Sequence, residues 1–253
     1  MSFDRLIRFL DKEGIERYGN VEGEIPASEL EGKTVQLVSS SIESGFKVLD
    51  EKAELVKLLC PLPSTPIIIC AGVNYKSHAK ETKFPPPKKP VIFATPPDRL
   101  AGPLDDIKIH PDAQELLDYE GELSIVIGKD GYDISEDDAL DYVLGYTISN
   151  DVSARNLHAI DSFDDFGPTG PYLVSPKLVP NPQALDLKTT VNGELIAFAS
   201  RGRTLRRGTV IMTGTPEGVG WHTNRCLKDG DVVEVSIGGL GFIRNKMVFH
   251  GGA

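Results

Sequence analysis

The sequence predicts a mainly β fold with some α-helix, arranged as a mixed β-sandwich or barrel-like roll with a small N-terminal β-rich domain. Short apolar runs rich in β-branched residues recur along the chain, and Gly, Pro or Asp bounds them, which is typical of strands. Helical periodicity is rare. With 253 residues, 40% of them hydrophobic and 25% charged, the chain can bury a substantial core.

The N-terminal domain is predicted to span residues 1–62. The run RLIRFLDKEGIERYG contains two alternating segments separated by a Gly-containing turn, which predicts a β-hairpin. Over about 41–59 the apolar spacing becomes helical. Three prolines in the stretch 61–66 then interrupt the chain, so we place the domain boundary there and assign residues 63–253 to the larger domain.

The larger domain is predicted to be built mostly from strands. The predicted strands are IIICAGV, PVIFAT, ELSIVIG, YVLGYTIS, PYLVSP, LKTTVNG, TVIMTG, DVVEVSI and FIRNKMVF. One helix is expected in the segment after Asn74, and the proline run at 85–87 must end it. A second helix is expected over SEDDALDYV, where Ser135 occupies the N-cap position before an acidic first turn.

Composition argues against several classes of partner and compartment. The formal charge of −10 disfavours nucleic acid, whose phosphates are normally met by Lys and Arg. Cys60, Cys70 and Cys226 have no paired spacing, which argues against a disulfide framework and a thiolate zinc site and favours a reducing compartment. The sequence shows neither a signal-peptide pattern nor an apolar run of membrane-spanning length. We therefore expect a cytoplasmic protein that does not bind a membrane.

Two acidic side chains share one face of the strand predicted in LLDYEGELSIVIGK. Glu120 and Glu122 are two residues apart, and side chains alternate along a strand, so both point the same way. Asp151 ends the next predicted strand in phase with Thr147 and Ser149. The spacing alone leaves two interpretations open: a solvated strand face, or a cation site. An all-oxygen ligand set suits Mg²⁺ first, or Mn²⁺ or Ca²⁺, rather than zinc.

A possible general base lies in NYKSHAKET. His78 and Glu81 are three residues apart, which makes them neighbours on one helical turn. A carboxylate bonded to one imidazole nitrogen raises the basicity of the other nitrogen, so the pair can accept a proton. An ordinary surface His–Glu pair is the alternative interpretation.

Three other residues are candidate substrate contacts, each with a structural alternative. Tyr75 can line a pocket or pack in the core. Arg155, in DVSARN, can clamp a substrate carboxylate or pair with the acidic cluster. Thr215, in TGTPEGVG, can present a hydroxyl and an amide to a carboxylate or oxyanion, or belong to an ordinary Gly-Pro turn.

Six ordered runs give the chain a family resemblance from about Ile67 to Phe249. They are AGVNYKSHAKE, DYEGELSIVIGK, GYTISNDVSARN, FGPTGPYLV, TVIMTGTPEGVG and LKDGDVVEVSIGGLG. In this order they resemble the fumarylacetoacetate hydrolase superfamily. The resemblance implies the fumarylacetoacetate hydrolase-like mixed β-sandwich roll and a homodimer.

The resemblance also implies roles for individual residues. The E-x-E pair and the Asp of N-D-V bind the metal in that family, which points to Glu120, Glu122 and Asp151. Family members that cleave acylpyruvates use a His and a Glu at the positions of His78 and Glu81, on a lid segment that closes over the substrate. The threonine before the motif proline has a binding role in the family, which here is Thr215.

The activity that the resemblance implies is Mg²⁺-dependent hydrolysis of a C–C bond in an acylpyruvate or related 1,3-diketo acid, through a metal-bound enolate. His78 with Glu81 would activate the water. Relatives with a similar site decarboxylate oxaloacetate or isomerise hydroxymuconate-type diacids, and these reactions stay open as alternatives. The expected partner is a small 2-oxo or diketo acid.

The chain departs from the family pattern at several positions. Asp161 stands where a lysine usually precedes the S-F-D-x-F-x-P motif, which replaces a cation that would stabilise an oxyanion. Thr95 stands where a lysine is often found. The segments between Arg155 and Asp161 and after Glu194 look short. A biosynthetic or catalytically degenerate metal-binding member is therefore a further alternative.

Overall fold

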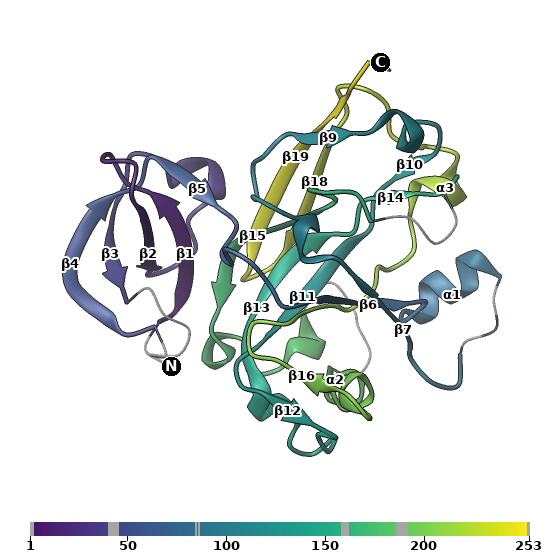
Figure 1. Ribbon diagram of the computed structural model, residues 1–253, viewed down its shortest axis with the longest axis horizontal. Helices are drawn as coiled ribbons and strands as arrows, with labels where there is room; N and C mark the ends of the chain where they lie inside the picture. The colour runs from purple at the N-terminus through teal and green to yellow at the C-terminus, as the bar shows by residue number, and fades with distance from the viewer. Residues whose placement is uncertain are drawn as a thin grey trace.

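The computed structural model describes residues 3–39, 46–83, 85, 87–157, 162–185 and 192–251. Strands dominate these residues, which confirms the predicted mainly β fold class (Figure 1). The strands are β1 Arg5–Leu10, β2 Glu16–Val21, β3 Thr34–Val38, β4 Val48–Glu54, β5 Lys57–Leu59, β6 Ile68–Gly72, β7 Val91–Thr95, β8 Leu100–Ala101, β9 Ile107–Ile109, β10 Leu117–Asp118, β11 Gly121–Ile127, β12 Gly131–Tyr132, β13 Val143–Asn150, β14 Ser153–Ala154, β15 Gly167–Val174, β16 Thr204–Leu205, β17 Val210–Met212, β18 Val232–Ile237 and β19 Gly241–Phe249.

Helices are short and lie between strands. The α-helices are α1 Lys76–Thr82, α2 Asn192–Ser200 and α3 Gly220–Thr223, and 3₁₀ turns occupy Ala27–Glu29, Pro97–Arg99, Pro111–Ala113, Ala139–Tyr142, Pro176–Leu178 and Pro182–Ala184. Helix α1 confirms the helix expected after Asn74. Among the described residues, no helix has the length and apolar character needed to cross a membrane.

One large sheet runs through the molecule in the order β4-β3-β2-β1-β15-β13-β11-β17-β6-β7, with β5 paired to β1 and β8 to β15. The predicted N-terminal hairpin is confirmed as the antiparallel pair β1–β2. Strands β1 to β5 gather on one side of the molecule and join the rest of the sheet through β1 and β15 (Figure 1). The boundary placed at 61–66 falls between β5 and β6, and the division into two domains stays a prediction.

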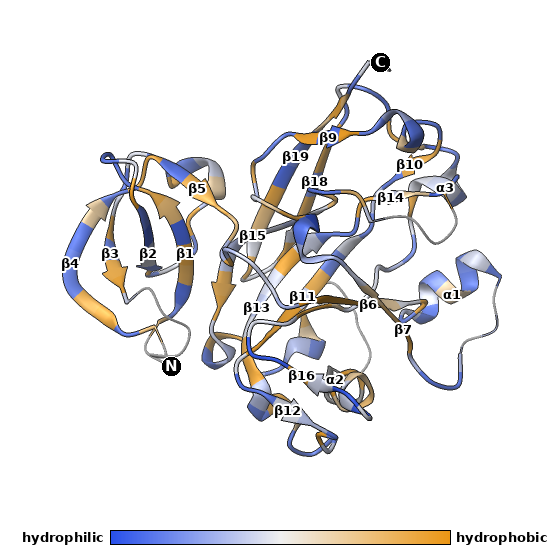
Figure 2. Ribbon diagram, in the orientation of Figure 1, coloured by the Kyte–Doolittle hydropathy of each residue, from blue (hydrophilic) through white to orange (hydrophobic). Residues whose placement is uncertain are grey.

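A second sheet, β18-β19-β9, packs against the central strands, with β19 on β15 and β18 on β13. Apolar residues concentrate in these central strands, as the orange segments of Figure 2 show. Both faces of β11 are covered as a result. Leu123 and Ile125 belong to the main core, whereas Val126 belongs to a second core on the opposite face. The charged residue of β11, Glu122, therefore lies in the protein interior.

Several local predictions are wrong, for identifiable reasons. The helical spacing over 41–59 corresponds, in the part that the structure describes, to β4 and β5. Because β4 is an edge strand, it tolerates charged residues whose spacing imitates a helix.

The second predicted helix also fails. Ser135 Oγ accepts the Asp138 amide at 3.2 Å, as an N-cap would, but only the 3₁₀ turn Ala139–Tyr142 follows before β13 begins. The strand LKTTVNG lies mostly outside the described residues, and its last two residues begin α2, a helix that the sequence analysis did not predict.

Candidate functional site

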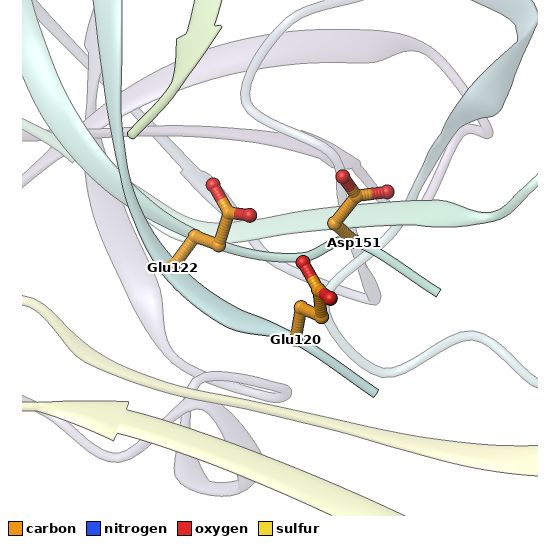
Figure 3. A group of neighbouring side chains, drawn as sticks. All are labelled: Glu120, Glu122 and Asp151. Atoms are coloured by element: carbon orange, nitrogen blue, oxygen red, sulfur yellow. The ribbon is translucent and has the colours of Figure 1, made fainter. Parts of the chain in front are cut away.

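Three carboxylates meet where β11 begins and β13 ends. Antiparallel pairing sets Gly121 opposite Asn150, so Glu120 and Asp151 lie at the same edge and Glu122 one step further in. One carboxylate oxygen from each of Glu120, Glu122 and Asp151 lies within 4.8 Å of the others, and the three side chains converge in Figure 3. We call these three carboxylates the triad. Glu122 is 1% exposed and Asp151 5%, so the solvated-face interpretation is wrong. The donor set suits a divalent cation that prefers oxygen ligands.

Glu122 is held by the backbone of the loop that follows β17. The amide of Gly214 donates to Glu122 Oε2 at 2.6 Å. Gly214 has a φ of +91°, and a Cβ there would lie 2.6 Å from the carbonyl oxygen of Ala71. Glycine is therefore required for the backbone to approach this carboxylate so closely.

Arg155 is held between two acidic residues. Its Nε donates to Asp118 Oδ2 at 2.9 Å and its Nη2 donates to Glu120 Oε1. This is the ion-pair arrangement that the sequence analysis named as the alternative to a substrate clamp. A substrate contact by Arg155 stays a prediction, and the structure gives this guanidinium two carboxylate partners.

Asp151 also has a cationic partner, which the sequence analysis missed. Arg99 Nη2 donates to Asp151 Oδ1 at 2.5 Å and to the carbonyl oxygens of Val152 and Phe166 at 2.9 and 3.3 Å. Arg99 is 1% exposed. No periodicity or motif in PPDRLAGP marks this arginine, because it precedes a strand of only two residues.

Burial changes the protonation of the cluster. It raises the pKa of Glu120 to about 7, although the charge of Arg155 acts in the opposite direction. Burial, followed by the charges of Asp151 and Glu120, raises the pKa of Glu122 well above its ordinary value. A bound cation would lower both pKa values again, because it favours the ionised form of both carboxylates.

A chain of hydroxyl groups continues the polar face of β11 into the sheet. Ser124 Oγ donates to Ser149 Oγ at 2.8 Å, and Ser149 Oγ lies 2.9 Å from Thr169 Oγ1. All three residues are buried, so the hydroxyls satisfy one another across β11, β13 and β15.

The His–Glu pair predicted from spacing is formed on α1. His78 Nδ1 lies 3.1 Å from Glu81 Oε2, and His78 is 8% exposed. The other oxygen of Glu81 accepts the amide of Gly218 at 2.9 Å. Glu81 thereby fixes the imidazole on one side and joins α1 to the loop after β17 on the other. The catalytic role of the pair stays a prediction.

The loop 213–219 and the start of α3 connect the two halves of the site. Besides holding Glu122 and Glu81, this segment donates the amides of Gly220 and Trp221 to Asp118, at 2.6 and 3.0 Å. Asp118 is fully buried and is the partner of Arg155. The sequence did carry a signal for it, since Asp118 has the same strand phase as Glu120 and Glu122.

The remaining predicted contacts line two pockets. Thr215 and Gly121 help to line a pocket of about 550 Å³, together with Tyr119 and residues of β18. Tyr75, 2% exposed, lines a second pocket of about 160 Å³ under α1. Substrate binding by Tyr75 and Thr215 stays a prediction. Asp161 and most of the short segment before it lie outside the described residues, and the segment after Glu194 forms α2.

Comparison with known proteins identifies the family of this chain. The sequence profile described as "Fumarylacetoacetate (FAA) hydrolase C-terminal" matches residues 67–248. A Xenopus laevis protein named "Oxaloacetate tautomerase fahd2, mitochondrial" is 38% identical over 247 residues, which cover 87% of this chain and 76% of that protein. "Oxaloacetate tautomerase YisK" of Bacillus subtilis is 38% identical over 220 residues, 76% of this chain and 73% of that protein.

Among solved structures, the 2-hydroxyhepta-2,4-diene-1,7-dioate isomerase of Mycobacterium marinum has a similar fold. It superposes with a TM-score of 0.80 at 29% sequence identity, covering 98% of this chain and all of that one.

Proposed function

Because the chain belongs to the fumarylacetoacetate hydrolase family, we propose that it catalyses proton transfer next to the carbonyl group of a small 2-oxo diacid, as in the keto–enol tautomerisation of oxaloacetate. The observation that carries the proposal is the anchoring of a three-oxygen cation site and a His–Glu pair on the same loop. Two relatives named as oxaloacetate tautomerases and a structural neighbour named as an isomerase support it.

The cation site supplies the electrophile for this chemistry. A divalent cation held by Glu120, Glu122 and Asp151, with Mg²⁺ as our first choice, would polarise the carbonyl of a 2-oxo acid and acidify the neighbouring C–H. Arg99 and Arg155 each neutralise one of these carboxylates. The two arginines therefore offset the negative charge of Asp151 and Glu120, which lowers the cost of holding these carboxylates close together.

The His–Glu pair supplies the proton transfer. Glu81 accepts from Nδ1 of His78, which leaves Nε2 as the nitrogen that accepts a proton. Nε2 takes the proton from the carbon beside the carbonyl, the C–H electron pair becomes the C=C bond, and negative charge moves to oxygen. Returning the proton to that oxygen gives the enol. No water and no oxidant are consumed, and the carbon skeleton stays intact.

Hydrolysis of a C–C bond makes a further demand, because attack of water creates a tetrahedral oxyanion that needs stabilisation. The two lysines expected from the family pattern are Asp161 and Thr95 in this chain, which weakens the case for that reaction. Hydrolysis of acylpyruvates is our second candidate. The pocket of about 550 Å³ beside Thr215 favours it, since the pocket has room for an acyl chain.

The test determines whether the carbon skeleton of the substrate stays intact. Protein loaded with Mg²⁺ is mixed with oxaloacetate in D₂O, and NMR records the enol, the deuterium at C3 and any product. We expect accelerated enol–keto exchange with all four carbons retained, beyond the rate with Mg²⁺ alone or with the Glu122→Gln variant. Pyruvate as product would instead identify a decarboxylase, and two acids from an acylpyruvate would identify a hydrolase. No acceleration of any of the three reactions would contradict an enzymatic role.

A further inference from the structure

The stretch from α1 to the segment before β7 is basic in an acidic protein. Five lysines, which we call the lysine cluster, lie here against a single acid: Lys76, Lys80, Lys83, Lys88 and Lys89. The stretch 76–89 thus has a formal charge of +4. Since the whole chain carries −10, the rest of it carries −14. Figure 2 shows α1 mostly in the blue of hydrophilic residues.

The charge of the lysine cluster is available to a ligand. All five lysines are exposed. Within the described part of the chain, the lysines that form ion pairs are Lys57 and Lys177, which lie elsewhere. Glu81, the one acid in the stretch, is instead bonded to His78 and to the Gly218 amide.

Part of the lysine cluster surrounds a pocket. Lys76, Lys88 and Lys89 line the cavity of about 160 Å³ under α1, together with Asn74 and the buried Tyr75. Such a volume accommodates a carboxylate group and a short carbon chain rather than a large ligand. Cationic side chains around a cavity with partly apolar walls concentrate anions there.

The pocket adjoins the candidate cation site through one residue pair. Asn74 Nδ2 donates to the carbonyl oxygen of Thr213 at 2.7 Å, and the next amide, that of Gly214, donates to Glu122. The wall of the pocket and a carboxylate of the triad are therefore bonded to consecutive residues of one loop.

A dianionic substrate needs cationic charge that the triad region does not supply. Arg99 is paired with Asp151, and Arg155 with Asp118 and Glu120. The two positions where the family pattern predicts lysine are Asp161 and Thr95.

We propose that the lysine cluster captures the carboxylate of the substrate that lies away from the reacting carbonyl, with Lys76, Lys88 and Lys89 forming its subsite beside Tyr75. The inference rests on the proposed function in taking the substrate to be a small diacid. It adds that affinity for the second carboxylate comes from α1 and the segment after it. Nucleic acid does not fit this surface, because the remaining charge of −14 repels an extended polyanion.

The kinetic test uses matched charge changes. Lys76→Gln, Lys88→Gln and Lys89→Gln are combined in one variant, and Lys12→Gln, Lys33→Gln and Lys246→Gln, at exposed positions, form the control. For oxaloacetate at about 10 mM ionic strength, we expect kcat/KM of the first variant to fall about tenfold with kcat changed less than about twofold. At about 0.5 M salt the difference should nearly vanish, because salt screens exposed charges. A variant that matches the control at every ionic strength would overturn the proposal.

A second measurement does not need turnover. Mg²⁺-loaded protein is acetylated with acetic anhydride in the presence of succinate or uncharged succinamide, and mass spectrometry gives the extent at each lysine. Succinate alone should protect Lys76, Lys88 and Lys89 and leave Lys12 and Lys33 unchanged. If no 2-oxo acid is turned over, the proposed function fails, while this protection still supports the subsite. Equal labelling with both compounds would overturn it.

Discussion

Arg99 donates a hydrogen bond to Asp151 at 2.5 Å, and both side chains are buried. One carboxylate of the candidate cation site therefore has a fixed counter-charge from the protein itself. We expect Arg99→Met to destabilise the metal-free protein by about 3 kcal/mol, since removing one partner of a buried ion pair leaves the other uncompensated.

Magnesium should restore part of that loss, because the cation supplies the missing positive charge. Thermal unfolding with and without Mg²⁺ should show a larger rise in Tm for Arg99→Met than for the wild-type protein. Arg206→Met is the control: Arg206 pairs with Asp130 at 2.9 Å on the surface and should change stability by less than about 1 kcal/mol. Equal Mg²⁺-dependent rises in all three proteins would argue against Arg99 as the counter-charge of the site.

The raised carboxylate pKa values predict how the site responds to pH. Burial raises the pKa of Glu120 to about 7, and a cation binds the ionised form. Mg²⁺ affinity, measured by titration calorimetry, should therefore weaken by about tenfold or more for each pH unit below 7. Affinity that does not change between pH 5.5 and 7 would contradict this.

The stability of the metal-free protein should decrease as the pH rises, whereas Mg²⁺ affinity should increase. Between an ordinary glutamate pKa of 4.5 and about 7, the folded state holds a proton on Glu120 that the unfolded state has released. The free energy of unfolding should therefore fall as pH rises through this window. Glu120→Gln should flatten this dependence in chemical denaturation, because glutamine does not titrate.

The His78–Glu81 pair predicts that a substitution can lower catalysis without weakening cation binding. His78→Asn should lower kcat by about 10²–10⁴-fold, because it removes the group that moves the proton. Mg²⁺ affinity should change by less than about twofold, since His78 bonds to Glu81 and not to the three carboxylates. A parallel loss of both quantities in kinetics and calorimetry would instead assign His78 a structural role.

The close approach of Gly214 to Glu122 predicts a steric effect. Gly214→Ala should cost about 2 kcal/mol or more and weaken Mg²⁺ binding, because the new Cβ would meet the Ala71 carbonyl oxygen at 2.6 Å and displace the amide from Glu122. Gly239→Ala is the matched control. Gly239 has a similar positive φ of +80° and open space around it, so only the backbone strain of about 1 kcal/mol applies. Equal losses in both variants, in denaturation and in Mg²⁺ titration, would show that the Glu122 contact is unimportant.

Alternation and spacing in the sequence predicted those contacts of the site that are made between side chains. Alternation on β11 placed Glu120 and Glu122 on one face, and spacing on α1 placed His78 beside Glu81, as the structure has them. Backbone amides have no such signature. The loop 213–219 and the start of α3 donate amides to Glu122, Glu81 and Asp118. Any residue except proline carries such an N–H, so no residue type in this segment predicts which carboxylate it bonds.

In the fold, too, some elements could be predicted from the sequence and others could not. Interior strands such as β13, buried along their whole length, were found from their apolar runs. The charged edge strand β4 was mistaken for a helix, because an edge position permits residues that propensity assigns elsewhere. Helix α2 was missed.

The loop after β17 also constrains the order in which the protein can become functional during synthesis. Its bonds to Glu122, Asp118 and Glu81 span 92, 102 and 137 residues of sequence. A ribosome has made all three triad carboxylates by residue 151, yet the Gly214 amide that holds Glu122 is translated only some tens of residues later. A nascent chain thus carries acidic ligands before it carries a finished site. Contacts of this range form late in folding, so competence for the reaction should arrive only when the C-terminal third has emerged and docked.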